Sequence, residues 1–155
     1  MKIAIVTGGS NGIGRATALE LGKRGISVIL TYNSYKDRAD DVVKEIEKNE
    51  SVRAVALKLD LAQKSTFESF TQEVKKNLKE IWNRTTFDYL VNNGGVGGPC
   101  LITELSDDYF DRIMNTNYKG PVFLTKLLVP FMEDGGAIVN TTSSSKSQSF
   151  PGYTN

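Results

Sequence analysis

The chain has 155 residues, of which 39% are hydrophobic and 24% are charged, and 19 basic against 18 acidic residues leave a net charge of +1. This composition is typical of one globular domain with its own core, and the balanced charge argues against nucleic acid or a membrane surface as a partner. Because histidine is absent, neither a Ser-His-Asp triad nor a histidine metal site can form, and no metal is expected. Cys100 is the only cysteine, and no signal-peptide core or membrane-spanning run is evident, so we expect a cytoplasmic protein without an internal disulfide.

The stretch from residue 7 to residue 14, Thr-Gly-Gly-Ser-Asn-Gly-Ile-Gly, predicts a phosphate-binding turn. It follows a strand-like apolar run, Lys2 to Val6, and leads into a helical pattern that ends at Gly25. Glycines allow a sharp turn and a close approach of the backbone to a pyrophosphate, while free N–H groups at a helix start face the anion. An ordinary glycine-rich turn is the alternative, but the position between a strand and a helix favours a nucleotide site.

The rest of the chain alternates strand-like and helix-like segments. We expect further strands at 26–32, 55–59, 87–91 and 136–142, further helices at 36–48, 67–81 and 106–132, and a loop at 143–155. Ser65 to Glu68 form a capping-box pattern before the third helix, and Ser106 is the expected N-cap of the fourth. Gly120-Pro121 should bend or split that last helix, because proline removes a helix hydrogen bond.

The apolar spacing assigns a buried face to each of the first three helices. The expected core positions are Ile13, Ala16, Leu19 and Leu21 in the first helix, Ala39, Val42, Val43 and Ile46 in the second, and Phe67, Phe70, Val74, Leu78 and Ile81 in the third. Strands that alternate with helices predict parallel βαβ units. The fold class is therefore α/β, with a Rossmann-like doubly wound parallel sheet in a single dinucleotide-binding domain, residues 1–155.

Polar and small residues follow all five predicted strands. After the glycine turn they are Tyr32 and Asn33, Asp60, the Asn-Asn-Gly-Gly run at 92–95, and Ser143. The carboxyl ends of parallel strands meet at one edge of a sheet, so we expect these residues to line a common ligand crevice. Asp60 could instead cap the segment that follows it, and the hydroxyl residues beside Ser143 have similar chemistry.

Four motifs, in order along the chain, resemble those of the classical short-chain dehydrogenase/reductase family. They are Thr-Gly-x-x-x-Gly-x-Gly at 7–14, Asn-Asn-Gly-Gly at 92–95, Asn-x-x-Gly at 117–120 and Gly-x-Ile-Val-Asn-x-x-Ser at 136–143. In the second motif Gly94 stands where the family usually has alanine. The resemblance implies an NAD(P)-dependent oxidoreductase that interconverts the carbonyl and alcohol groups of a small molecule by hydride transfer.

The resemblance also implies a cofactor role for each matching residue. The diphosphate would be held by Gly8, Ser10, Asn11, Gly12, Ile13 and Gly14. Asp60 would bind the amino edge of the adenine with Leu61 at its flank. Asn92 and Gly94 would line the adenosine half of the site.

The catalytic residues that the resemblance implies are Ser143 and Asn117. Ser143 would hydrogen-bond the substrate carbonyl oxygen, and Asn117 would support a catalytic lysine through its backbone and a water, although Asn117 could also be an exposed helix residue. The family further needs a tyrosine that donates a proton and a lysine four residues later that lowers the tyrosine pKa. The register from Ser143 puts that tyrosine just past Asn155, and Tyr153 lies too close to Ser143 to replace it.

We therefore expect the chain to be C-terminally truncated, to hold the cofactor half of an oxidoreductase without the Tyr/Lys pair, and to be inactive alone. One alternative is a catalytically inactive nucleotide-binding or regulatory module. Another is a flavodoxin-like domain without hydride chemistry, which the Asn-Asn-Gly-Gly and Asn-x-x-Gly runs disfavour.

The segment after the second strand bears on the choice of cofactor. An acidic residue there would bind the ribose 2′-OH of NAD, but residues 32–36 are Tyr-Asn-Ser-Tyr-Lys, with Arg38 nearby. Neutral donors and cations suit a 2′-phosphate, so NADP(H) is favoured over NAD(H).

The helix at 107–132 carries more apolar residues than one sheet face needs, and in the family this helix pairs with its symmetry mate. We expect a homodimer or homotetramer when the protein is complete.

Overall fold

A computed structural model describes residues 1–143, and most of the predicted loop, with Tyr153, lies outside the described residues. Five parallel strands form one sheet in the order β3-β2-β1-β4-β5. They are β1 (Lys2–Val6), β2 (Ile26–Tyr32), β3 (Ala54–Lys58), β4 (Phe87–Asn92) and β5 (Met132–Asn140). The chain moves outward from β1 to β3 and then crosses to the other side of β1 for β4, so the topology reverses between β1 and β4.

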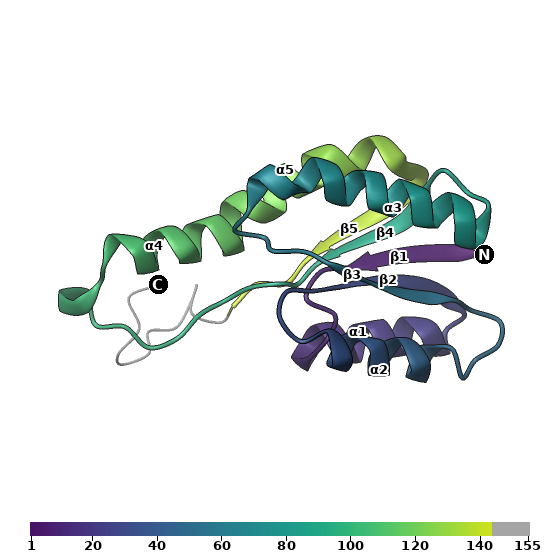
Figure 1. The fold of residues 1–155 in the computed structure, drawn as a ribbon, viewed down its shortest axis with the longest axis horizontal. Helices are drawn as coiled ribbons and strands as arrows, with labels where there is room; N and C mark the ends of the chain where they lie inside the picture. Colours follow the sequence, from purple (N-terminus) through teal and green to yellow (C-terminus); the bar gives the residue numbers. More distant parts are fainter. Residues whose placement is uncertain (144–155) are drawn as a thin grey trace.

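Helices cover both faces of the sheet (Figure 1). One face carries α1 (Gly12–Lys23) and α2 (Lys36–Ile46), and the other carries α3 (Phe67–Trp82) and α5 (Gly120–Leu128). Helix α4 (Asp107–Met114) continues the line of α5 beyond the carboxyl ends of the strands. The short helical turns are η1 (Lys64–Thr66), η2 (Ile102–Glu104), η3 (Asn115–Lys119) and η4 (Val129–Phe131). This arrangement confirms the predicted α/β, doubly wound, Rossmann-like fold.

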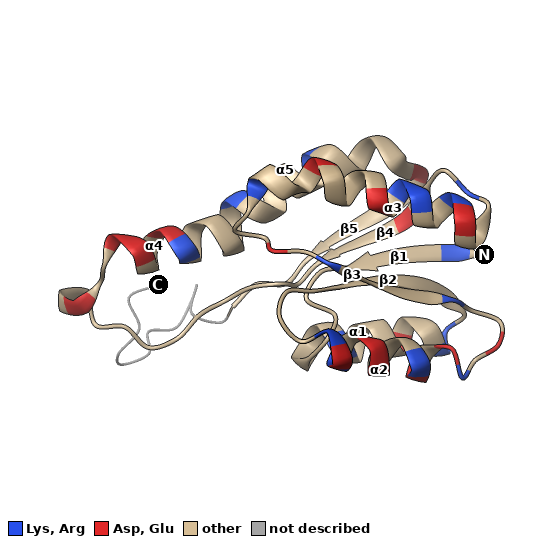
Figure 2. Cartoon of the chain, in the orientation of Figure 1, with Lys and Arg blue, Asp and Glu red and all other residues tan. Residues whose placement is uncertain are grey.

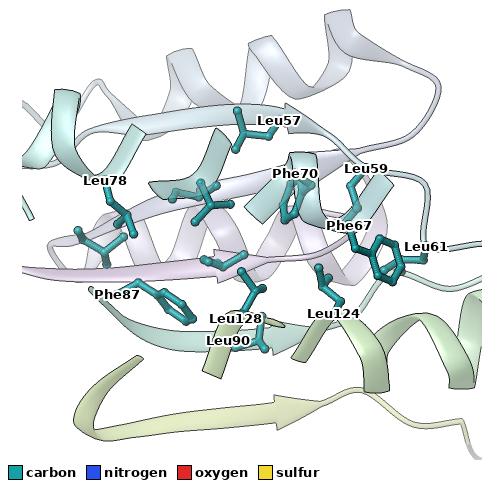
Figure 3. Close-up of a cluster of buried hydrophobic side chains, with 14 of the residues drawn as sticks. Leu57, Leu59, Leu61, Phe67, Phe70, Leu78, Phe87, Leu90, Leu124 and Leu128 are labelled. Carbon is teal, nitrogen blue, oxygen red and sulfur yellow. The ribbon is translucent and has the colours of Figure 1, made fainter. Parts of the chain in front are cut away.

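Each face of the sheet has its own hydrophobic core. The central strand β1 is buried from Ile3 to Val6, as expected for a parallel strand covered on both sides. Figure 3 shows the larger core, which lies under α3 and α5 and includes Leu57, Leu59, Leu61, Phe67, Phe70, Leu78, Phe87, Leu90, Leu124 and Leu128. The smaller core lies under α1 and α2 and includes Val6, Ala18, Val28, Leu30, Ala39, Val42 and Ile46.

The buried face of α1 differs from the prediction. Ile13 is 67% exposed, and the buried residues of the helix are Gly14, Ala18 and Gly22. A Cβ on Gly22 would lie 2.8 Å from the Ile46 Cγ2 atom, so α1 packs too closely against α2 for a side chain there. The prediction was wrong for Ile13 and Ala16, which are exposed because close backbone packing selects small residues for the inner face, whereas Leu19 and Leu21 are partly buried against the core. The predicted helix end is confirmed, with Gly25 at a φ of +78° directly after the cap.

Helix α3 differs from its prediction at both ends. The capping box at 65–68 does not form, because a 3-10 turn precedes the helix and the Thr66 hydroxyl donates to the Gln63 carbonyl oxygen (2.8 Å). At the other end Trp82 is buried, whereas Ile81 is 38% exposed. The four predicted core positions from 67 to 78 are all buried, so the helical period was assigned correctly and only its last turn was misjudged.

The segment from 106 to 131 is divided into consecutive helical parts. Ser106 is the N-cap as predicted, and its Oγ accepts a hydrogen bond from the Tyr109 N–H (3.2 Å). Helix α4 passes into a π-helical turn, η3, at Asn115, and α5 begins at Gly120 with Pro121 in its first turn. Because proline has no N–H to donate, the helix widens just before it. The predicted break at Gly120-Pro121 thus takes the form of a π-helical turn.

Strand β5 begins at Met132, earlier than the predicted Gly136. The pairing with β4 shifts register in its first part, and Gly135 has a φ of +79° at this irregularity. The strand lies at the edge of the sheet, with Ile138 and Val139 exposed. The bulge explains the early start, since the residues before Gly136 extend the strand without regular pairing.

A buried carboxylate ties the amino edge of the sheet together. Asp88 accepts hydrogen bonds from the Ile3 N–H, the Lys2 Nζ and the Arg84 Nη1, each at 2.8 Å. Burial alone would raise the pKa of Asp88, but the hydrogen bonds from Lys2, Ile3 and Arg84 outweigh burial and hold the pKa below its usual value. Arg84 also donates to the Met1 carbonyl oxygen (3.0 Å), so the first residues are fastened to β4.

Candidate dinucleotide site at the carboxyl edge

The glycine turn joins β1 to α1 at the centre of the carboxyl edge. Gly8 has a φ of +64°, in the left-handed region where glycine is favoured. A Cβ on Gly14 would lie 2.2 Å from the Gly8 carbonyl oxygen, so the turn and the helix start are in backbone contact. The first turn of α1 is Gly-Ile-Gly-Arg, and the Asn11 side chain does not cap it. The N–H groups at this helix start are therefore available to an anion.

Thr7 holds the loop after β4 against the glycine turn. Its side chain is buried, and its Oγ1 accepts hydrogen bonds from the N–H groups of Asn93 and Gly94, both at 2.9 Å. In return, the Asn93 Nδ2 donates to the Thr7 carbonyl oxygen (3.1 Å). We call these contacts the Thr7 clasp. They fix the Asn-Asn-Gly-Gly motif beside the phosphate turn, although the two motifs lie far apart in the sequence.

Two cavities of about 590 and 500 Å³ lie along this edge. We call them the Ser143 cavity and the Tyr32 cavity, after a residue in the wall of each. Both walls include Gly8, Asn11, Gly94, Gly95 and Val96, so the cavities form one trough. The trough crosses the position where the strand order reverses, which is where doubly wound sheets bind ligands.

The trough brings together most of the predicted site residues. The wall of the Ser143 cavity includes Gly8, Asn11, Ile13, Asn92, Gly94, Asn117 and Ser143. The wall of the Tyr32 cavity includes Gly8, Ser10, Asn11, Tyr32, Asn33, Asp60, Leu61 and Gly94. Gly12 and Gly14 line neither cavity: a Cβ on Gly12 would meet open space, whereas Gly14 is buried under the turn. These two glycines shape the turn between β1 and α1, but the structure does not place them in the wall of either cavity.

Asp60 makes a local turn as well as lining the Tyr32 cavity. Its Oδ1 accepts a hydrogen bond from the Ala62 N–H (2.9 Å), and its carbonyl oxygen accepts one from the Gln63 N–H (3.0 Å). Asp60 therefore caps the following segment with one carboxylate oxygen, as the alternative interpretation held. The same turn holds Leu61 in the wall of the cavity.

Asn117 is exposed, as the alternative interpretation of this residue held, but the oxygen and the nitrogen of its side-chain amide each make a hydrogen bond. The Asn117 Oδ1 accepts a hydrogen bond from the Val96 N–H (2.8 Å), and its Nδ2 donates to the Val96 carbonyl oxygen (2.6 Å). The π-helical turn presents this side chain to the loop after β4. Asn117 therefore anchors the part of the trough wall that both cavities share.

Asn92 is a buried amide that is only partly satisfied. Its Nδ2 donates to the Thr125 Oγ1 (3.1 Å) and the Asn140 Oδ1 (3.0 Å), whereas its Oδ1 has no hydrogen-bond partner within residues 1–143. Buried acceptors without a donor are rare in native proteins. The Asn92 Oδ1 is itself shielded from the trough, so the fit to a polar ligand rests on the backbone cradle, which a Cβ would fill.

The residues near the end of β2 carry their charges away from the trough. The Lys36 Nζ pairs with Asp40 (2.6 Å), and the Arg38 guanidinium lies 4.5 Å from the centre of the Tyr35 ring. The hydrogen bond to Asp40 raises the pKa of Lys36. Neither cation lines the Tyr32 cavity, whereas Arg112 of α4 does. Any electrostatic preference for a 2′-phosphate must therefore come from Arg112, from polar groups, or from movement of Lys36 or Arg38.

Sequence reasoning missed several residues of the site. Thr7, Arg112 and Asn140 all contact or line the trough. Thr7 and Asn140 stood inside matched motifs without an assigned role, so the motif itself could have indicated them. Arg112 had no sequence signal, because only the tertiary position of α4 brings it to the cavity.

The loop between β4 and α4 carries no charged residue before Glu104, and Figure 2 shows the charges gathered on the outer helices. Within residues 1–143 no group of three or more His, Cys, Asp or Glu side chains is placed to hold a metal ion. In the same part of the chain, none of the helices is long and apolar enough to cross a membrane.

The fold and the site define a doubly wound α/β protein with a dinucleotide-type crevice. The sequence model of the family described as short chain dehydrogenase matches residues 2–155. The chain belongs to this family of oxidoreductases, as its four motifs predicted.

Individual relatives agree with this assignment. The chain is 33% identical over 142 residues to the tetrahydroxynaphthalene reductase PfmaG of Pestalotiopsis fici, covering 92% of this chain and 49% of the relative. It is 35% identical over 157 residues to the 3-oxoacyl-[acyl-carrier-protein] reductase FabG of Staphylococcus epidermidis, covering 99% of this chain and 61% of the relative. It spans about half to three fifths of the length of these curated relatives.

A solved structure with a similar fold is the angucycline C-6 ketoreductase LanV with bound NADP. The TM-score is 0.93 at 36% identity, and the match covers 98% of this chain and 59% of LanV. The likeness therefore extends over the whole sheet and both helical layers of the described chain.

Proposed function

We propose that this chain is the cofactor-binding part of an NADP(H)-dependent oxidoreductase that interconverts the carbonyl and alcohol groups of a small molecule. The observation that carries the proposal is the continuous trough from Tyr32 to Ser143, with the helix start of α1 between its ends. A dinucleotide along it would have its adenosine in the Tyr32 cavity and its diphosphate at the helix start. Its nicotinamide, the source of the hydride, would lie near Ser143.

The residues of the Ser143 cavity have separate tasks in this proposal. The Ser143 hydroxyl would donate to the substrate carbonyl oxygen, where negative charge develops during hydride transfer. Asn117 would keep the adjoining wall in place through Val96. Asn92 would fasten β4 to β5 at the edge of this cavity through its hydrogen bond to Asn140.

We further propose that residues 1–155 bind cofactor without turnover. Within residues 1–143 neither a tyrosine nor a lysine lines the Ser143 cavity, and the Tyr/Lys pair that the family pattern requires would fall beyond Asn155. A positioned acid is typically worth about 10²–10⁴-fold in rate. Binding without turnover is also what the regulatory-module alternative predicts, and only a version extended beyond Asn155 separates the two.

The preference for NADP(H) over NAD(H) is supported by the residues after β2 and by the similar structure with bound NADP. Residues 32–35, which line the Tyr32 cavity, include no carboxylate that would repel a 2′-phosphate. Hydroxyl and amide groups of Asn33 and Ser34 are suitable donors to it.

We propose a homodimer or homotetramer for the complete protein. An exposed apolar row runs along α4, η3 and α5, formed by Phe110, Met114, Tyr118 and Val122, which are between 40% and 66% exposed. A row of this kind is typical of an interface between subunits.

A cytoplasmic location stays a prediction, which cell fractionation tests.

The test of this function is a titration of NADPH and NADH onto the chain, followed by fluorescence, and then a comparison of NADPH oxidation with a version extended through the next Tyr and Lys. We expect tighter binding of NADPH and ketone-dependent oxidation only by the extended version. Tighter NADH binding would contradict the cofactor choice. Equal turnover by the two versions would contradict the role of the Tyr/Lys pair, and binding with no turnover by either would favour the regulatory module.

A further inference from the structure

Leu61 lies between two glycines from different parts of the chain. A Cβ on Gly94 would lie 2.8 Å from the Leu61 Cδ1 atom, closer than real Cβ contacts. A Cβ on Gly120 would lie 2.3 Å from the Leu61 carbonyl oxygen. The first glycine therefore makes room for the side chain of Leu61, and the second makes room for its backbone.

The surroundings of Leu61 leave one direction for any displacement. The residue is 7% exposed and belongs to the core cluster that also contains Phe67 and Leu124, and Figure 3 shows it at the end of that cluster beside Phe67. Protein cores are close-packed, so this side offers no free volume. Its backbone is held by the Asp60 turn and by contact with Gly120. The remaining side faces the Tyr32 cavity, whose wall Leu61 helps to form.

We infer that Gly94 is a positioning residue for the adenine end of the trough, because the absence of a side chain at this position lets Leu61 form the cavity wall. An alanine at position 94 would compete with Leu61 for one volume and push it into the space of the adenine. Gly120 acts on the same residue through its backbone. The assignment to adenine rests on the proposed function, whereas the steric competition does not.

This inference gives a new role to the departure from the family pattern at position 94. The glycine at position 94 does more than fit a crowded motif. It leaves free the volume that an alanine methyl group would take, and Leu61 occupies that volume. Positions 61 and 94 should therefore behave as a coupled pair. The Gly8 N and the Thr7 Oγ1 also lie 3.3 and 3.4 Å from a Cβ at position 94, so a shorter residue at 61 should remove the largest part of the crowding around a methyl group there.

A double-mutant cycle tests the coupling. The variants are Gly94→Ala, Leu61→Val and the two combined, with Gly97→Ala as the matched control, because a Cβ on Gly97 of the same loop meets nothing within 4 Å. The readouts are the dissociation constants of 5′-AMP and 2′,5′-ADP by calorimetry and the midpoint of urea unfolding. These nucleotides share the adenine and report binding without any turnover.

We expect Gly94→Ala to weaken both nucleotides about tenfold, the size of a moderate overpacking cost, and Gly97→Ala to leave them unchanged. In the Leu61→Val background the same Gly94→Ala change should alter the affinities by less than about twofold. That limit matches the scatter with which the effects of separate substitutions add, so a larger change would count as a real effect. Gly120→Ala should also weaken binding, but Leu61→Val should not restore it, because that contact is with the backbone. If Gly94→Ala does not fold alone, a folded double variant supports the inference, and failure of both variants contradicts it.

The two possible failures are distinguishable. If the unsubstituted chain binds neither nucleotide, the proposed function fails and the adenine assignment fails with it. If the unsubstituted chain binds and Gly94→Ala binds equally well, the proposed function stands and this inference is overturned. Equal effects of Gly94→Ala with and without the Leu61→Val change, in both affinity and unfolding, would likewise overturn the coupling.

Discussion

Replacing Thr7 by valine tests whether the Thr7 clasp holds the trough together. Valine keeps the shape of threonine and removes only the hydroxyl, so packing is preserved while the N–H groups of Asn93 and Gly94 lose their acceptor. A buried donor left without a partner costs about 1–3 kcal/mol, and these two bonds are partly buried, so the lower end applies to each. We expect the free energy of unfolding to fall by about 2 kcal/mol in total.

The measurement is urea denaturation of the unsubstituted chain, Thr7→Val and Thr7→Ser. Serine retains the hydroxyl and serves as the matched control, so it should stay closer to the unsubstituted chain than valine does. NADPH binding should weaken in Thr7→Val, because Gly94 and its neighbours form the wall between the two cavities. A Thr7→Val variant within about 0.5 kcal/mol of the unsubstituted chain would refute the reasoning, because that is the usual range of surface substitutions without a structural role.

Three further changes probe other parts of the molecule. Asp88→Asn should lower the free energy of unfolding by about 2 kcal/mol, the range for hydrogen bonds to a charged group, because Lys2 and Arg84 remain partly exposed to solvent. Because the folded pKa of Asp88 is lowered, its contribution is present above the unfolded pKa of about 3.9 and is lost as the pH falls through the folded value. Urea midpoints measured between neutral and acidic pH should therefore depend less on pH in the variant, and an unchanged slope would contradict this account. Asn117→Ala should weaken both NADPH and 5′-AMP by releasing Val96, which lines both cavities, and unchanged affinities for the two ligands would argue against this anchor. In the complete protein, Tyr118→Lys should shift the assembly toward monomers in light scattering, and an unchanged mass would remove the exposed apolar row from the interface.

Much of the fold could be predicted from the sequence because parallel sheets impose strong local patterns. Strands such as β1 are apolar and buried after their first residue, and helices such as α2 show a clear amphipathic period. The inner face of α1 could not be predicted in this way. Its inner face is set by close approaches of the helix backbone, at Gly14 to the glycine turn and at Gly22 to Ile46 of α2, so these glycines are buried while Ile13 is exposed. The ends of α3 depended likewise on tertiary contacts that periodicity does not contain.

The candidate site was predictable where topology determines position. Residues at the carboxyl ends of parallel strands must meet at one edge, and Tyr32, Asp60, Asn92 and Ser143 do line one trough. Which atoms bond to which was not predictable, because those partners are distant in sequence. The Thr7 clasp is an example, since it joins residues more than eighty positions apart.

The position of the first residue has a practical consequence for biosensor work. Met1 lies at the amino edge of the sheet, where its carbonyl oxygen accepts a hydrogen bond from Arg84, and Figure 1 shows the N-terminus at the opposite end of the sheet from the loops that form the trough. An affinity tag or a surface linker joined ahead of Met1 would therefore point away from the ligand entrance. Immobilisation through that end should present every molecule with its trough toward the solution, whereas random coupling through lysines would attach the protein in many orientations.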